Sequence, residues 1–285
     1  MRNYIFLILI LLFGCGGGGS DETSVSGTND STNSTGNDSS SSNNTTSAGF
    51  TKKVDVFGIS ILATNNVSDA KVLHAAKVMA SYLDNDDDGV SDNSLILEAM
   101  KSAKAYLFML GSESEQDQVT LPSGEGQLLL EDETRPAGSS SAGFDATLEE
   151  VLHLITHLGY ANAYPTIFGE SSSSLTVAMD VARGGHFTIP NQYPSSAWYT
   201  YDDTTCDYSC QATEYFYWSL TSILGAQDYS GRLDDILGEW QLNTSDKVQS
   251  TDSLIYALLT DIQYKLPTKI PNRNYSATAL TITTP

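Results

Sequence analysis

Hydrophobic residues first follow a regular pattern along the chain at Phe50. The run 54–63, VDVFGISILA, is rich in β-branched and other apolar residues and predicts a strand. After it, Ser68 stands where a helix cap is expected, and apolar residues recur at helical spacing as far as Leu83. The folded part is therefore predicted to begin with a strand followed by a helix.

Amphipathic stretches and short apolar runs continue to the end of the chain. The expected helices cover 95–104, 148–158, 175–183, 211–224 and 246–259, and the expected short strands cover 106–110 and 127–131. Because helices and strands mix without a regular βαβ rhythm, we expect an α+β fold with a small sheet. We place it in a single domain over residues 50–285.

The first fifteen residues, MRNYIFLILILLFGC, have the features of an export signal. Arg2 precedes an apolar run over 4–13, which is too short to span a bilayer as a mature helix. The segment 12–15, LFGC, resembles the bacterial lipobox, whose cysteine is acylated. The resemblance implies a lipid on Cys15 and a protein anchored in the cell envelope, at the outer membrane or cell surface. The alternative is an ordinary signal peptide with an incidental cysteine.

Residues 16–49 have a different composition from the rest of the chain. They contain no aromatic residue, no Lys and no Arg, and Val25 is their only branched aliphatic residue. Such a segment cannot bury enough apolar surface to offset its ordering entropy. We expect a disordered linker with a root-mean-square span of about 30 Å.

The charge balance restricts the class of partner. The chain has 14 basic and 35 acidic residues and a formal net charge of -21. This excess excludes nucleic acid as an expected partner and is compatible with divalent cations. With Cys15 assigned to the lipid, Cys206 and Cys210 remain as an even pair in an oxidising compartment, so a short disulfide is expected. Two zinc thiolates are the alternative.

The segment 84–92, DNDDDGVSD, lies between two expected helices. Its carboxylates alternate at positions one, three and five, with glycine at position six. It resembles the EF-hand calcium loop and the loops of thrombospondin type 3 repeats, and the resemblance implies a Ca²⁺ site within 84–95. The implied ligands are Asp84, Asp86, Asp88, the backbone of Val90 and Asp92.

Position twelve of this loop departs from the EF-hand pattern. Leu95 stands where the bidentate glutamate is expected, and Glu98 reaches the ion only if the following helix is displaced. Calcium affinity is therefore expected to be modest, as in extracellular modules. The alternative is an acidic turn that only caps a helix.

A second candidate site lies on the expected helix of 147–158, TLEEVLHLITHL. His153 and His157 stand four apart, so both rings are predicted to project from one face. The arrangement resembles the zincin metallopeptidase helix, in which HExxH supplies two zinc ligands and a general base. Leu154 occupies the place of the motif's glutamate, so the base is expected to be Glu150 or Glu149.

Glu214 is the expected third ligand, because a carboxylate in an apolar, aromatic helix is costly to bury unless it is paired or metal-bound. Gluzincins also take their third ligand from a glutamate on a later helix. The alternative places Glu214 on a solvated face. His186, next to two glycines, is the reserve ligand, and His74 is expected to be a packed core histidine.

Purely structural roles are the alternatives for the other residues of this region. Thr147 and Glu150 have the spacing of a helix capping box, which would commit Glu150 to a backbone amide. Two histidines on a helix can also be buried and hydrogen-bonded to neighbours. The aromatic segment 192–201, QYPSSAWYTY, can line a cleft, but packing of the domain is favoured.

The leading hypothesis is an envelope-anchored, zinc-dependent hydrolase with a peptide or protein substrate, stabilised by calcium. The alternative is a non-catalytic, calcium-binding structural or binding lipoprotein whose histidines are inert or hold a structural metal. The resemblances cover separate segments, and they do not assign the whole chain to a characterised family.

Overall fold

The computed structural model describes residues 48–136, 144–190, 192–271 and 273–285. The predicted signal peptide, Cys15 and the linker up to residue 47 lie outside the described residues. Among the described helices, none combines the length and the apolar character that crossing a membrane requires.

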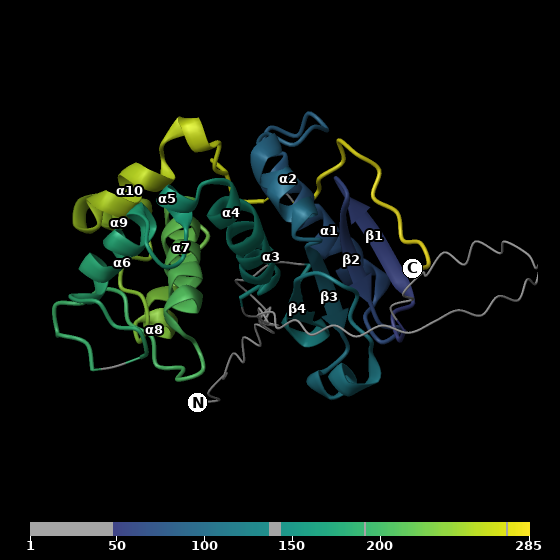
Figure 1. Ribbon diagram of the computed structural model, residues 1–285, viewed down its shortest axis with the longest axis horizontal. Coiled ribbons are helices and arrows are strands. Elements are labelled where there is room, and N and C mark those ends of the chain that lie inside the picture. Colours follow the sequence, from purple (N-terminus) through teal and green to yellow (C-terminus); the bar gives the residue numbers. More distant parts are fainter. Residues whose placement is uncertain (1–47, 137–143, 191, 272) are drawn as a thin grey trace, which may run out of the picture.

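One four-stranded sheet lies at one end of the domain, with the strand order β1-β2-β3-β4 (Figure 1). The strands are β1 (Lys52–Val56), β2 (Ile59–Ala63), β3 (Tyr106–Leu110) and β4 (Gly126–Leu130). The first pair is antiparallel and the other two pairs are parallel. The helices α1 (Asp69–Leu83) and α2 (Ser94–Ser102) connect β2 to β3. This mixture of helices with a small sheet confirms the α+β class.

The single strand predicted over 54–63 is wrong, because the chain reverses in its middle. Val56 pairs with Ile59, so only Phe57 and Gly58 form the turn. Their φ angles are 54° and 93°, as a two-residue hairpin with the right-handed twist of its strands requires. Phe57 hides this turn from sequence reasoning, because a phenylalanine rarely adopts a positive φ.

The helix that carries the candidate metal ligands lies in the middle of the fold. It consists of α3 (Thr147–Ile155), a π-helical turn η3 (Thr156–Tyr160) and α4 (Ala161–Ala163). The α3 segment contacts α1 and β4 on one side and α7 (Tyr208–Ile223) on the other (Figure 1). It therefore joins the sheet half of the domain to the helical half.

The helical half also contains α5 (Pro165–Phe168), α6 (Ser174–Arg183), α8 (Arg232–Ile236), α9 (Ser245–Thr251) and α10 (Ser253–Leu259). Short 3-10 turns are η1 (Glu113–Gln118), η2 (Glu131–Glu133) and η4 (Ile262–Tyr264). The helix predicted over 246–259 is broken at Asp252, with φ −116° and ψ 67°. The side chain of Asp252 accepts the Ile255 N–H and so starts a new helix.

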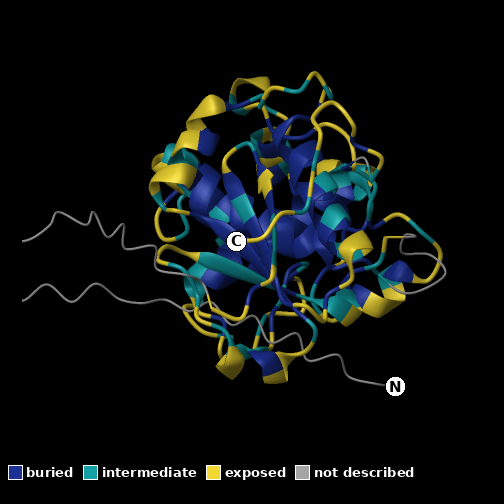
Figure 2. Ribbon diagram, turned by 90° about the vertical axis from the view of Figure 1, so that its right-hand side faces the viewer, coloured by how far each residue is buried: buried dark blue, intermediate teal, exposed yellow. Residues whose placement is uncertain are grey.

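One hydrophobic cluster extends from Val54 to Tyr275 and passes through both halves (Figure 2). A smaller cluster on the other face of the sheet contains Phe50, Leu62 and Phe108. Because side chains of β3 enter both clusters, all five of its residues are buried.

The predicted disulfide is confirmed. Cys206 and Cys210 are bonded, with their Cα atoms 5.3 Å apart, at the start of α7. Both side chains are buried. The zinc-thiolate alternative is therefore wrong, because both sulfurs are used in the bond.

Candidate metal centre

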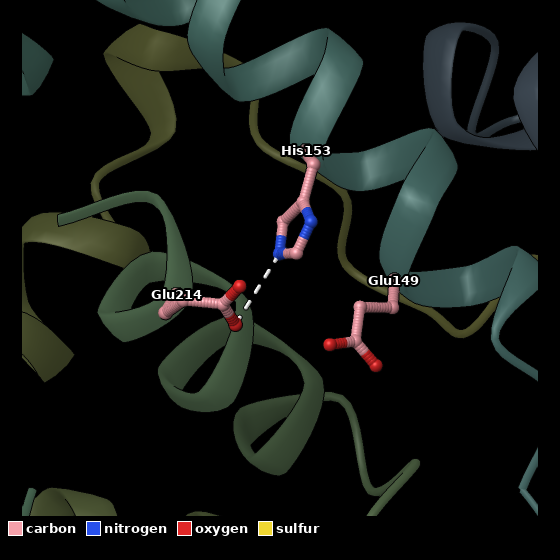
Figure 3. Close-up of side chains that lie close together, drawn as sticks. All are labelled: Glu149, His153 and Glu214. Carbon is pink, nitrogen blue, oxygen red and sulfur yellow. Dashed lines mark ion pairs between the residues drawn. The ribbon is translucent and has the colours of Figure 1, made fainter. Parts of the chain in front are cut away.

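Three acidic or imidazole side chains converge between α3 and α7. They are Glu149 and His153 of α3 and Glu214 of α7, and their ligand atoms all lie within 4.8 Å of one another. Figure 3 shows Glu149 and His153 projecting from one helix towards Glu214 on the facing helix. Their exposed fractions are 7%, 2% and 2%, so the group is buried in the protein interior. The alternative that placed Glu214 on a solvated face is excluded.

The local sequence explains this convergence. Glu149 and His153 are four residues apart on a regular helical segment, so they share a face. All nine residues of α3 are buried, and every residue of α7 from Cys210 to Ser222 is buried. The polar side chains on these helices are therefore largely shielded from bulk water and need partners within the protein.

Two atoms of the group lack hydrogen-bond partners. Nε2 of His153 lies 3.5 Å from Oε2 of Glu214, but neither Nε2 nor Oε1 of Glu214 has a hydrogen bond to any described residue. Buried polar atoms in native proteins are nearly always bonded to a partner. An ion between the three side chains would coordinate both atoms.

Burial and charge also make this group unfavourable without a cation. Burial raises the pKa of Glu149 well above its ordinary value, and the charge of Glu214 raises it further. Burial alone would lower the pKa of His153, but Glu214 and Glu150 outweigh it, so the pKa is raised well above its ordinary value. Excess negative charge in a buried site is the condition that a bound cation relieves.

Glu150 does not form the capping box that the sequence allows. Ala146 is the N-cap residue, and Thr147 is already the first residue of α3. The side chain of Glu150 instead accepts a hydrogen bond of 2.6 Å from Nε2 of Gln127 in β4. Its Oε2 also lies 3.7 Å from Nδ1 of His153. Glu150 therefore contacts the side of the imidazole ring that faces away from Glu214.

His157 is not part of the group, so the predicted histidine pair is wrong. Its Nδ1 lies 2.8 Å from Glu170, and its Nε2 lies 3.6 Å from Glu125. The ring of His157 is held by these two glutamates, and the helix changes to a π-helical turn over Thr156–Tyr160, which includes His157. Spacing of four residues predicts a shared face only in a regular α-helix.

The remaining two histidines lie elsewhere. His186, the reserve ligand, has a side chain that is 58% exposed and lies 2.8 Å from Asp180, so this expectation is wrong. His74 is buried and lies 2.7 Å from Asp145, which confirms a packed core histidine.

Comparisons with protein-family models, curated proteins and solved structures found no match. The resemblances to lipoproteins, EF-hands and zincins therefore stay predictions. The geometry of the described residues carries the assignment that follows.

Two residues near the centre were missed by sequence reasoning. Gln127 reaches Glu150 from β4, and Glu239 follows α8. Burial and the charges of Glu214 and Asp202 raise the pKa of Glu239 to about 7. Neither residue belongs to a local motif, so only the tertiary fold reveals them. In the aromatic segment, Tyr199 and Tyr201 are buried, which agrees with the packing role that the sequence favoured.

The acidic loop after α1 brings some of its predicted ligands together. Carboxylate oxygens of Asp84, Asp86 and Asp88 lie within 4.8 Å of one another. Asp84 is fully buried and accepts hydrogen bonds from the backbone of Gly89 and from the hydroxyl of Tyr275. The loop is therefore folded around its first aspartate.

The other loop residues are arranged differently. Asp92 is not in the carboxylate group, because its Oδ2 accepts a 2.6 Å hydrogen bond from the backbone of Asn85. Leu95 is 59% exposed in the first turn of α2. The Glu98 side chain is 71% exposed and pairs with Lys101, so Glu98 does not replace the missing ligand.

Proposed function

We propose that the protein binds one divalent transition metal ion through Glu149, His153 and Glu214. The observation that carries the proposal is the pair of buried atoms without partners, Nε2 of His153 and Oε1 of Glu214, inside a group whose ligand atoms lie within 4.8 Å. One imidazole nitrogen with carboxylate oxygens suits Zn²⁺ and also Mn²⁺. The zinc predicted from two histidines is thus one of the ions that these ligands accept.

In this proposal Glu150 positions His153 and does not act as the base. A metal-binding histidine usually donates its other N–H to a carboxylate, which fixes the tautomer and the orientation of the ring. Glu150 lies on the Nδ1 side of His153, and Gln127 holds Glu150 in place. The Nε2 lone pair is then directed towards Glu214 and the ion.

The activity we propose is hydrolysis of a peptide. Three protein ligands leave a coordination position open, and a bound ion lowers the pKa of water there. Glu149 would hold the ion through one oxygen, and its second oxygen would then be placed to accept a proton from the water that the ion acidifies. Glu149 is therefore assigned as ligand and proton acceptor.

The second candidate function is a binding lipoprotein with a structural metal. Burial favours it, because none of the three ligands is more than 7% exposed. A catalytic ion needs a path for its substrate, whereas a structural ion does not.

Turnover separates the two functions. We expect Zn²⁺- or Mn²⁺-loaded protein to cleave a fluorogenic peptide library, and the metal-free protein and Glu214→Gln to lose at least about 100-fold in rate, since removing one charge-stabilising group already costs this much. Glu170→Gln, which removes the partner of His157 outside the centre, is the control. Stoichiometric metal without peptide cleavage would contradict the hydrolase and favour the structural metal.

We further propose that the 84–92 loop binds Ca²⁺ through Asp84, Asp86 and Asp88. Crowding of their carboxylates supports it: Asp86 has a raised pKa, through desolvation and then the charges of Asp88 and Asp92. A cation would relieve this repulsion. With Leu95 at position twelve, affinity in the millimolar range of extracellular modules is expected.

Calcium should stabilise the wild-type protein. At a Ca²⁺ concentration 100 times the Kd, the expected gain is about 2.7 kcal/mol, because only the folded loop binds the ion. Asp86→Asn should abolish the gain, and Asp228→Asn, an exposed change elsewhere, should retain it. Thermal unfolding with and without 10 to 50 mM CaCl₂ measures this. An equal midpoint in both buffers for the wild type would contradict calcium binding.

We also propose that Cys15 is acylated and anchors the protein in the bacterial cell envelope. The support is the LFGC sequence at the end of the apolar run. Cys15→Ser should abolish incorporation of a labelled fatty acid and move the protein from the membrane fraction to the soluble fraction. A variant that stays membrane-bound would show that another segment provides the attachment.

A further inference from the structure

A hollow lies on the face of the sheet that carries the smaller hydrophobic cluster. It is lined by positively charged residues, whereas the protein as a whole is strongly negative. Its volume is about 380 Å³, and the residues that line it include Lys53, Lys101 and Lys104. The chain has a net charge of -21 and only 14 basic residues, yet three of them meet here. No acidic side chain lines the hollow.

The hollow has an apolar floor and a polar rim. Lys53 of β1 stands opposite Leu62 of β2, and Ser60 pairs with Tyr106 of β3, so these side chains share one face of the sheet. Leu62 and Tyr106 are buried, and Ser123 adds a hydroxyl at the rim. The smaller hydrophobic cluster covers the β3 side of this face, and the hollow lies where that cover ends towards β1.

The lysines are not neutralised within the protein. Neither Lys53 nor Lys104 has an ion pair or a side-chain hydrogen bond with any residue that the structure describes. Lys101 has only a 3.6 Å pair with the exposed Glu98. Pro285 also borders the hollow, and no ion pair between the described residues joins its carboxylate to a lysine. The positive charge is thus free to act on a ligand.

Ordinary structural roles explain two of these lysines but not the third. A lysine on an edge strand discourages aggregation, which accounts for Lys53, and a lysine in the last turn of a helix suits the helix dipole, which accounts for Lys101. Lys104 has a φ of 53°, a left-handed conformation that favours glycine. A lysine thus occupies a position where glycine would cost less.

We propose that this hollow binds a small amphiphilic anion, with its carboxylate or phosphate head at the three lysines and its apolar part on Leu62 and Tyr106. The volume is within the range of small-molecule sites. The site is separate from the metal centre, because none of its lining residues belongs to α3 or α7.

The test is calorimetric titration of the metal-loaded protein with decanoate, and separately with inorganic phosphate. We expect decanoate to bind the wild type more tightly than phosphate, and to bind more weakly at high ionic strength because salt screens the lysines. Lys53→Gln combined with Lys104→Gly should weaken decanoate binding at least about tenfold, which corresponds to about 1.4 kcal/mol. Lys77→Gln, the same charge change outside the hollow, should bind as the wild type does.

Lys104→Gly is chosen because glycine adopts the local φ without strain, so the variant is expected to fold. Equal decanoate affinity in the double variant and the wild type would overturn the site. Phosphate that binds as tightly as decanoate would overturn the apolar half of the ligand.

Discussion

Replacing His153 with alanine is expected to abolish metal binding at the centre between α3 and α7. His153 supplies the only nitrogen among the three converging ligands, and its Nε2 has no other partner among the residues described. Loss of a partner beyond the ligands already costs 10- to 100-fold in metal affinity, so we expect a loss of more than about 100-fold here.

Metal binding at this centre should also be measurable as a change in the thermal stability of the protein. At a metal concentration 1,000 times the Kd, binding should stabilise the wild type by about 4 kcal/mol, and a chelator should remove this gain. His153→Ala should unfold at one temperature with or without metal. The control is His186→Ala, because His186 is exposed and lies at Asp180. A metal-dependent midpoint in His153→Ala would place the ion elsewhere.

Of the substitutions proposed for this protein, Asp145→Asn should cause the largest loss of folding stability. Asp145 is fully buried, lies 2.7 Å from Nε2 of His74, and accepts the backbone N–H of Arg135. Asp145 is the buried acceptor for these groups and also lies 3.6 Å from Nη2 of Arg273, and removing one partner of a buried charged pair typically costs about 3 to 5 kcal/mol. For a domain of this size the midpoint should fall by about 6 to 20 °C.

The pH dependence follows from the sign of the shift at Asp145. Burial acts to raise its pKa, but the hydrogen bond and charge of His74 outweigh burial, so the folded pKa lies below the ordinary value. This contribution is therefore present above about pH 4, where unfolded aspartate ionises, and is lost as the pH falls towards the folded pKa.

Thermal unfolding of Asp145→Asn at neutral and acidic pH checks both statements, with the exposed Asp117→Asn as the control. The difference from the wild type should be largest near neutral pH and should shrink in acid. A difference below about 1 kcal/mol at pH 7 would contradict the assigned role of the pair.

The sequence predicted most helices because their apolar residues recur at regular spacing. It failed where a tertiary effect changes local geometry. Phe57 adopts a positive φ within the hairpin, and Asp252 divides a predicted helix into two. Phenylalanine rarely adopts such a turn, and the N-cap at Asp252 lies within a stretch whose apolar spacing reads as one helix, so neither break was recognised from the sequence.

In the candidate site too, some residues could be predicted from the local sequence and others only from the tertiary fold. Glu214 was identified from composition, since a buried carboxylate among aromatic residues requires a partner. His157 was misplaced because spacing along a helix does not show that Glu170 and Glu125 lie beside its ring. Gln127 is 23 residues from Glu150 in the chain, so their contact follows only from the packing of α3 against β4.

X-ray absorption at the metal edge of the purified, metal-loaded protein tests the central claim most directly. We predict one ion per chain with a first shell of one imidazole nitrogen and carboxylate oxygens about 2.0 to 2.2 Å from the ion. In Glu214→Gln the bound metal should fall to the level of the chelated protein. A shell with two imidazoles, or stoichiometric metal retained in Glu214→Gln, would contradict a centre formed by Glu149, His153 and Glu214.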